Sequence, residues 1–238
     1  MQFYSGNKFL DHLKEQSMFI VPPTGTWSVI YADGNNQPLM NLVVHNSAEA
    51  FEKNKNSLPK TSKILCGTLI VIGPDTFWLK WDTDKKQKLH TGDSLFLEFK
   101  SKNLVLSQSY QGKPFNSKAS SYYHLWQSKQ KFVGGIVDID LIRLDKSNLP
   151  IELIEVKRSR IAIDTWQPYL NDKGGYEILE RFCIQQKLQF SIIYYHYDPK
   201  NEIEDIEQLL VFKKTGEFKF MKIGVFSLKS FMKSEYNF

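Results

Sequence analysis

Apolar and polar positions along the first hundred residues mostly follow the period of two that is typical of β-strands. Two exceptions have the spacing of short amphipathic helices, at 7–17 and 46–56. The turn residues between the apolar runs favour antiparallel pairing, so we expect a β-rich N-terminal region. The predicted strands of this region are 26–32, 39–45, 63–73, 76–81 and 94–100.

The pattern changes in the second half of the chain, where strands and a longer helix alternate. The polar stretch 111–121 separates the two halves, so we expect an accessory region at 1–115 and a core domain at 116–238. The core pattern predicts an α/β (α+β) fold with a mixed central sheet flanked by helices, closed by a C-terminal hairpin and a short helix. The predicted core elements are strands at 121–126, 136–144 and 150–157, a helix at 174–187 and a strand at 189–197.

Composition restricts the class of protein without naming one. The 238 residues carry a formal net charge of +5, which is compatible with a polyanionic partner but does not require one. The two cysteines, Cys66 and Cys183, lie in apolar runs and are expected to be buried thiols. The N-terminus lacks the pattern of a secretory leader and no long apolar run is present, so we expect a cytoplasmic protein without a membrane span. Neither a Walker A nor a GxGxxG motif occurs, so no nucleotide cofactor is expected.

The acidic residues of 134–160 are the strongest chemical signal in the chain. Asp138 and Asp140 are two positions apart, so on one strand they point to the same face. Glu155 and Lys157 have the same spacing on the next predicted strand. If these strands pair, carboxylates and one ammonium meet at one sheet edge, which is typical of a divalent cation bound beside a phosphate.

Glu-x-Lys occurs three times, and context distinguishes the copies. The copy at Glu155 and Lys157 follows the strand with the two aspartates and precedes a helix and a buried strand. The copy at 98 and 100 is preceded only by an aspartate in a turn, where aspartate is common for backbone reasons. The copy at 217 and 219 has no upstream aspartate on a suitable strand. We therefore assign the candidate site to the Glu155 copy.

The order of strands, helix and strand around these residues resembles the core of the PD-(D/E)XK nuclease superfamily, over about residues 118–200. That core carries Asp on its second strand and (D/E)xK on its third. The resemblance implies a restriction-endonuclease-like fold in which Asp140 and Glu155 bind metal and Asp138 is an auxiliary acid. The alternative is that Asp138 is the main ligand and Asp140 the auxiliary acid. It also implies Mg²⁺, with Mn²⁺ as a substitute, bound in addition by the backbone carbonyl of Val156, and Lys157 as a catalytic residue.

Basic and polar residues after the motif are candidates for contact with nucleic acid: Arg158, Arg160, Gln167 and Lys173. For the two arginines, a solvated strand end explains the sequence equally well. The aromatic residues Trp166, Tyr169 and Tyr176 have two interpretations, stacking on an unpaired base or packing beneath the loop, and packing is favoured.

We therefore expect a metal-dependent DNA endonuclease of restriction or defence type that acts on double-stranded DNA. A homodimer is a further expectation, because many such nucleases cut both strands as dimers. Two alternatives stay open on the sequence. One is a nuclease with the same core for RNA, repair, recombination or transposon ends, and the other is a non-catalytic nucleic-acid-binding module.

Overall fold

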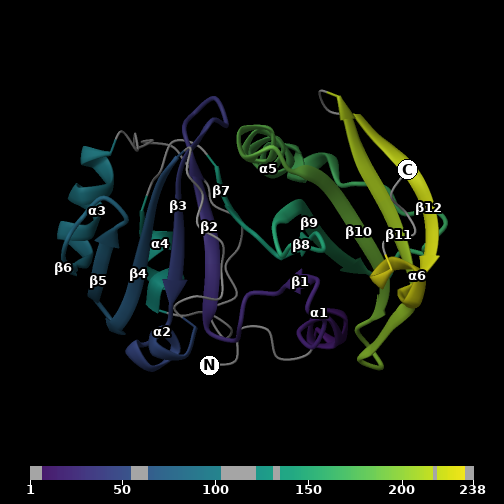
Figure 1. The fold of residues 1–238 in the computed structure, drawn as a ribbon, viewed down its shortest axis with the longest axis horizontal. Helices are drawn as coiled ribbons and strands as arrows, with labels where there is room; N and C mark the ends of the chain where they lie inside the picture. The colour runs from purple at the N-terminus through teal and green to yellow at the C-terminus, as the bar shows by residue number, and fades with distance from the viewer. Residues whose placement is uncertain (1–6, 55–63, 103–121, 131–134, 217–218, 234–238) are drawn as a thin grey trace. The chain divides into compact units, whose positions relative to one another are not determined.

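The computed structural model describes residues 7–54, 64–102, 122–130, 135–216 and 219–233. Within them the chain is mixed α+β and forms two six-stranded sheets (Figure 1). Each sheet belongs to one compact unit. The first unit comprises Pro22–Ile139, and the second combines the segment ending at Val21 with the segment beginning at Asp140. The chain therefore passes between units after residue 139, whereas the sequence predicted a boundary near residue 115.

The sheet of the first unit has the strand order β6-β5-β4-β3-β2-β7. Its neighbours are antiparallel except β3 and β4, which run parallel because α2 lies between them in the chain. The expected antiparallel meander is therefore wrong at this one step. The elements of this unit are β2 (Thr26–Ala32), β3 (Pro38–His45), α2 (Ala48–Asn54), β4 (Leu65–Gly73), β5 (Thr76–Trp81), β6 (Lys88–Thr91), α3 (Gly92–Ser101), α4 (Tyr122–Lys129) and β7 (Ile136–Asp138).

Two predicted strands of the first unit are helices. The stretch 94–100 belongs to α3, where Leu95 and Phe99 are buried one helical turn apart while Leu97 is exposed. The stretch 121–126 overlaps α4, where Tyr123 and Trp126 enter the same core. Apolar runs this short are compatible with both the helical period of 3.6 and the strand period of 2. The spacing of their aromatic residues therefore does not distinguish a helix from a strand.

The sheet of the second unit has the order β1-β8-β9-β10-β11-β12. Only β9 and β10 are parallel, and the helix α5 lies between them in the chain as the crossover connection that such a pair requires. The elements are α1 (Lys8–Leu13), β1 (Phe19–Ile20), β8 (Leu141–Leu144), β9 (Pro150–Ser159), η2 (Leu170–Asp172), α5 (Lys173–Gln186), β10 (Gln189–Asp198), β11 (Ile203–Gly216), β12 (Lys219–Ser227) and α6 (Leu228–Met232).

Helices cover both faces of this second sheet (Figure 1). On one face Tyr176 of α5 packs on Phe190, with ring centroids 6.5 Å apart. On the other face Phe9 of α1 packs on Tyr195, with ring centroids 5.6 Å apart. Phe190 and Tyr195 are an odd number of positions apart on β10, which is why they point to opposite faces. This alternation decides which residues of β9 share a face with α5.

The predicted strand at 136–144 is wrong as a single element. It is divided into β7, which pairs with β2 in the first unit, and β8, which pairs with β9 in the second. The interruption is stabilised by a hydrogen bond from the Ile139 backbone N–H to the Ser28 carbonyl, 2.8 Å long. Both cysteines, Cys66 and Cys183, are buried free thiols, as expected.

The polar stretch 111–121, which the sequence placed between the two halves, lies outside the described residues. In the part of the chain that is described, no helix is long and apolar enough to cross a membrane.

Candidate functional site

The candidate site begins where β8 and β9 pair in the second unit. Leu141 is opposite Ile154 and Ile142 is opposite Leu153, and Asp140 immediately precedes this paired segment. The Asp140 carboxylate is fixed there because its Oδ2 accepts the backbone N–H of Val156 at 2.9 Å. Asp140 therefore lies at the start of β8, with its carboxylate bound to the backbone of the strand that carries Glu155 and Lys157.

Lys157 completes this group from the same strand as Glu155. The two residues are two positions apart and share a face, and Lys157 Nζ lies 2.8 Å from Glu155 Oε1. The same nitrogen lies 2.8 Å from Asp172 Oδ2 and 5.5 Å from the centre of the Tyr176 ring. Burial alone lowers the pKa of this ammonium, but Glu155 and Asp172 outweigh burial and raise it above its ordinary value. The lysine is therefore a fixed, fully charged cation.

Asp172 is the residue that the sequence did not identify. It ends η2 and precedes the first residue of α5, a position where aspartate normally caps the helix. Here its side chain makes no capping hydrogen bond and binds Lys157 instead. In the sequence, Asp172 is indistinguishable from an ordinary helix cap, and no local signal connects it with a strand 15 positions earlier.

The donor set is consistent with Mg²⁺ on chemical grounds. Asp140 and Glu155 offer carboxylate oxygens, and the predicted third donor is the carbonyl of Val156, whose N–H already binds Asp140. No group of three or more His, Cys, Asp or Glu side chains suited to a metal ion occurs among the described residues. Mg²⁺ is commonly held by one or two carboxylates together with water and substrate phosphate, so this donor set fits it.

Asp138 does not belong to this group. It lies on β7 opposite Val29, in the first unit, and does not continue the strand that follows Asp140. Its charge acts on the hydroxyls of Tyr31 and Tyr123, which are hydrogen bonded at 2.5 Å and whose pKa values are raised chiefly by burial. The predicted common strand of Asp138 and Asp140 is therefore wrong, and the auxiliary metal role of Asp138 loses its geometric basis.

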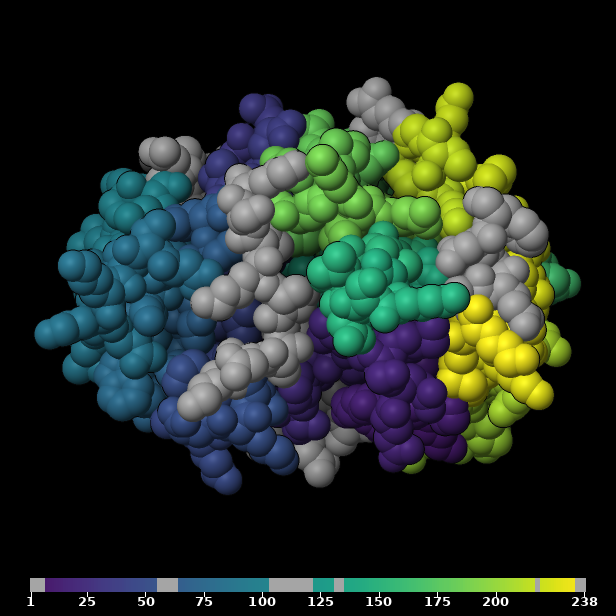
Figure 2. Space-filling view, in the orientation of Figure 1, coloured from purple at the N-terminus to yellow at the C-terminus, as the bar shows by residue number. Residues whose placement is uncertain are grey.

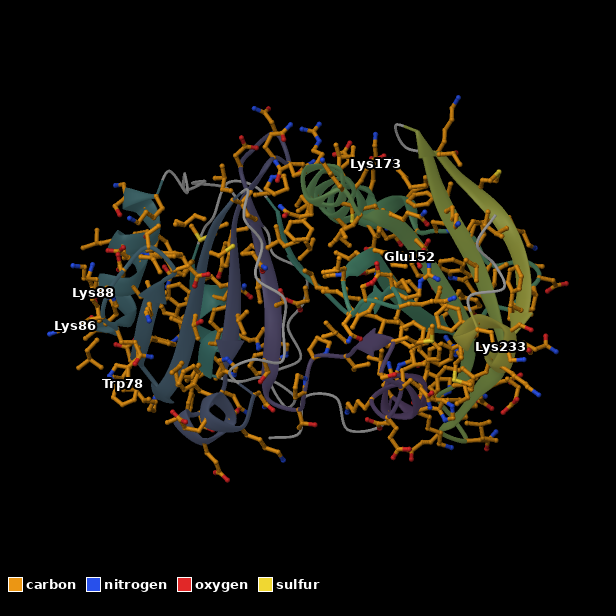
Figure 3. The ribbon with its side chains drawn as sticks, in the orientation of Figure 1. Trp78, Lys86, Lys88, Glu152, Lys173 and Lys233 are labelled. Atoms are coloured by element: carbon orange, nitrogen blue, oxygen red, sulfur yellow. The ribbon has the colours of Figure 1, made fainter. Side chains whose placement is uncertain are left out.

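The four residues predicted to contact nucleic acid differ in their position relative to Lys157. Arg158 follows Lys157 on the strand and so points to the opposite face, where it forms an ion pair with Glu204. Arg160, Gln167 and Lys173 are exposed. Lys173 lies at the first turn of α5, directly after Asp172 (Figure 3). Of the predicted contacts, Lys173 is thus adjacent in sequence to a residue that binds Lys157.

Trp166 supports the interpretation of the loop aromatics as packing. It is fully buried and stacks on Tyr194 with ring centroids 4.4 Å apart and an interplanar angle of 3°. Tyr169 contacts the edge of the same indole at 5.5 Å. Trp166 therefore fixes the loop that leads to η2, and base stacking by this residue is excluded by its burial.

The rejected Glu-x-Lys copy at Glu98 and Lys100 does not form a comparable group. Glu98 lies on α3, where positions two apart point in different directions, and it accepts the indole N–H of Trp81 at 2.7 Å. Glu217 lies outside the described residues. Comparison of the chain with family models, with curated proteins and with solved structures gave no match. The site is therefore interpreted from its own geometry.

Proposed function

We propose that the second unit is a divalent-metal-dependent phosphodiester hydrolase, a DNA endonuclease of restriction or defence type. The observation that carries this proposal is the ion pair of Glu155 with Lys157 on β9, together with the Asp140 carboxylate held on the backbone N–H of Val156 between them. Two hard carboxylates beside a fixed ammonium suit a metal-bound phosphate, because the metal and the lysine both neutralise negative charge.

The order of elements supports the same proposal. The second unit contains β1, β8, β9, α5 and β10 in this order along the chain. Asp140 immediately precedes the second of these strands and Glu155 and Lys157 lie on the third, as in the PD-(D/E)XK core. With β1 as the first strand, the core does not need a strand at 121–126. The restriction-endonuclease-like fold is thus proposed with the whole of Pro22–Ile139 inserted after its first strand.

In this mechanism Asp140 and Glu155 would hold the cation, with the carbonyl of Val156 as a further donor. A bound Mg²⁺ supplies a water of lowered pKa and polarises the phosphate. Lys157 orients that water or stabilises the charge that develops on the phosphate oxygens. Asp172 keeps the lysine ammonium in place when the Glu155 carboxylate is engaged elsewhere, because it binds the same nitrogen independently.

Cleavage of supercoiled plasmid with Mg²⁺, Mn²⁺ or EDTA, beside single-stranded RNA, tests the proposal. We expect metal-dependent DNA cleavage that Glu155→Ala abolishes and that Lys157→Ala slows by about 100- to 1,000-fold, the typical loss of one charge-stabilising group. Lys100→Ala is the matched control, because Lys100 belongs to a Glu-x-Lys copy on an exposed helix position. Undiminished cleavage by both site variants would refute the assignment. Cleavage of RNA alone would move the activity to that substrate, and binding without cleavage would favour a binding module.

A separate experiment tests the positioning role of Asp172. Asp172→Asn leaves Lys157 with Glu155 alone, so the pKa of the lysine should fall from its raised value. NMR spectra of the lysine ammonium at neutral pH test this contact without any need for activity, because an ammonium held by two carboxylates exchanges its protons with water more slowly than one held by a single carboxylate. Asp172→Glu should restore slow exchange in part, whereas unchanged exchange in Asp172→Asn would show that Glu155 alone holds the ammonium.

A further inference from the structure

A pocket opens beside the candidate site, between the start of α5 and the β11–β12 hairpin. It is a small, open recess lined by residues of η2, α5, β11 and β12. Tyr169, Tyr176 and Phe220 line it with aromatic rings, and Lys173 and Glu177 contribute polar groups. Figure 2 shows the atoms of α5 at the surface of the molecule, coloured green. The pocket is thus mainly apolar and aromatic, with a charged edge.

The walls of this pocket are held firmly. The ring centroids of Tyr176 and Phe220 are 5.3 Å apart, and the two ring planes make an angle of 74°. Beneath them Lys214 is almost fully buried, where it pairs with Glu180 and donates to the Gly216 carbonyl at 2.7 Å. Aromatic side chains that are already held in place lose little conformational entropy when a ligand packs on them.

Tyr176 connects the pocket to the candidate site. Its ring lines the pocket and also lies 5.5 Å from Lys157 Nζ. A group held in the pocket is therefore next to, and not at, the phosphate that Lys157 would meet.

We propose that the pocket of Tyr169, Tyr176 and Phe220 binds one unpaired nucleobase of the substrate strand, adjacent to the phosphate bound at Lys157. A base is flat and apolar on its faces, which suits the aromatic walls, and polar on its edge, which suits Glu177 as an acceptor. The exposed ammonium of Lys173 complements the backbone phosphate attached to that base. This inference rests on the proposed function and defines its substrate as single-stranded, or as a duplex from which one base is extruded.

Binding to a single-stranded oligonucleotide that carries 2-aminopurine tests the inference in EDTA, where no metal-dependent cleavage occurs. Stacking quenches the fluorescence of this base analogue, and anisotropy of an end label gives the affinity. We expect quenching by the wild-type protein and a loss of affinity of about 5- to 150-fold in Tyr169→Ala, equivalent to the 1–3 kcal/mol of one stacked base. Tyr169→Phe keeps the ring and should bind like the wild type.

Lys173→Glu should weaken binding, whereas the charge-matched control Lys200→Glu, at an exposed turn after β10, should not. Equal quenching and equal affinity in Tyr169→Ala and the wild type would overturn the inference. Plasmid cleavage that persists in that case would leave the proposed nuclease intact. Conversely, ring-dependent quenching without metal-dependent cleavage in the separate assay would support the base pocket and refute the nuclease.

Discussion

The buried ion pair between Arg143 and Glu152 offers a quantitative test of the sheet that carries the candidate site. The two residues are opposed on β8 and β9, with Arg143 Nε 2.8 Å from Glu152 Oε2 and side chains only 2% and 0% exposed. The hydroxyl of Ser191 on β10 donates to the other oxygen of the carboxylate. Glu152 therefore links three adjacent strands within the second unit (Figure 3).

Removal of either partner leaves the other charge buried without its ion-pair partner. We expect Glu152→Leu or Arg143→Met each to lower the free energy of unfolding by about 3–5 kcal/mol. In the double variant no ionised group remains, so most of this loss should be recovered. The Ser191 hydroxyl then lacks its acceptor, which costs about 1–3 kcal/mol. The double variant should thus lie within about 3 kcal/mol of the wild type, far from the sum of the single losses.

The wild type, the two single variants and the double variant form a double-mutant cycle. Urea unfolding of these four proteins, monitored by circular dichroism and tryptophan fluorescence, gives the free energies of unfolding. Coincident transitions are needed for the free energies to be compared, because the chain has two compact units. Losses below about 1 kcal/mol in both single variants would show that water reaches the pair. Additive losses in the double variant would show that the two charges do not interact, and either result would refute the reasoning.

Three further predictions concern stability. Burial lowers the pKa of His45 to about 4, so the unfolded chain takes up a proton first as the pH falls below about 6.5. Stability should therefore fall by about 1–3 kcal/mol between pH 6.5 and 4, and His45→Gln should make this slope shallower in thermal melts. Thr91→Ala removes the cap that accepts the Ser94 N–H and should cost about 0.5–2 kcal/mol in urea, with Thr91→Ser as the conservative control. Trp166→Ala should cost about 3–5 kcal/mol by the same measurement, and a smaller loss would show that the loop collapses onto Tyr194.

Much of the fold follows from local patterns. The strand predicted at 26–32 matches β2, the one at 76–81 matches β5, and the one at 189–197 differs from β10 by a single residue. The helix predicted at 174–187 is close to α5. These segments are long or strongly periodic, so the pattern of their apolar residues predicts whether one face or both faces are buried.

The main error in the candidate site has a structural cause. Asp138 and Asp140 are in phase, but in-phase residues share a face only if one strand contains both. The strand is interrupted between them and continues in another sheet. No local pattern records the interruption, because Ile136, Ile139 and Leu141 are apolar residues that suit either sheet.

By itself the sequence determined that Glu155 and Lys157 would share a face, since this depends only on the alternation of a strand. Only the tertiary structure decided which aspartate lies beside them, because the strand is interrupted after Asp138 and the Asp140 carboxylate binds the Val156 N–H of β9. It also brought Asp172 to Lys157 and turned Arg158 towards Glu204. These contacts join residues 15 and 46 positions apart, and such pairing is fixed by chain packing rather than by neighbouring residues.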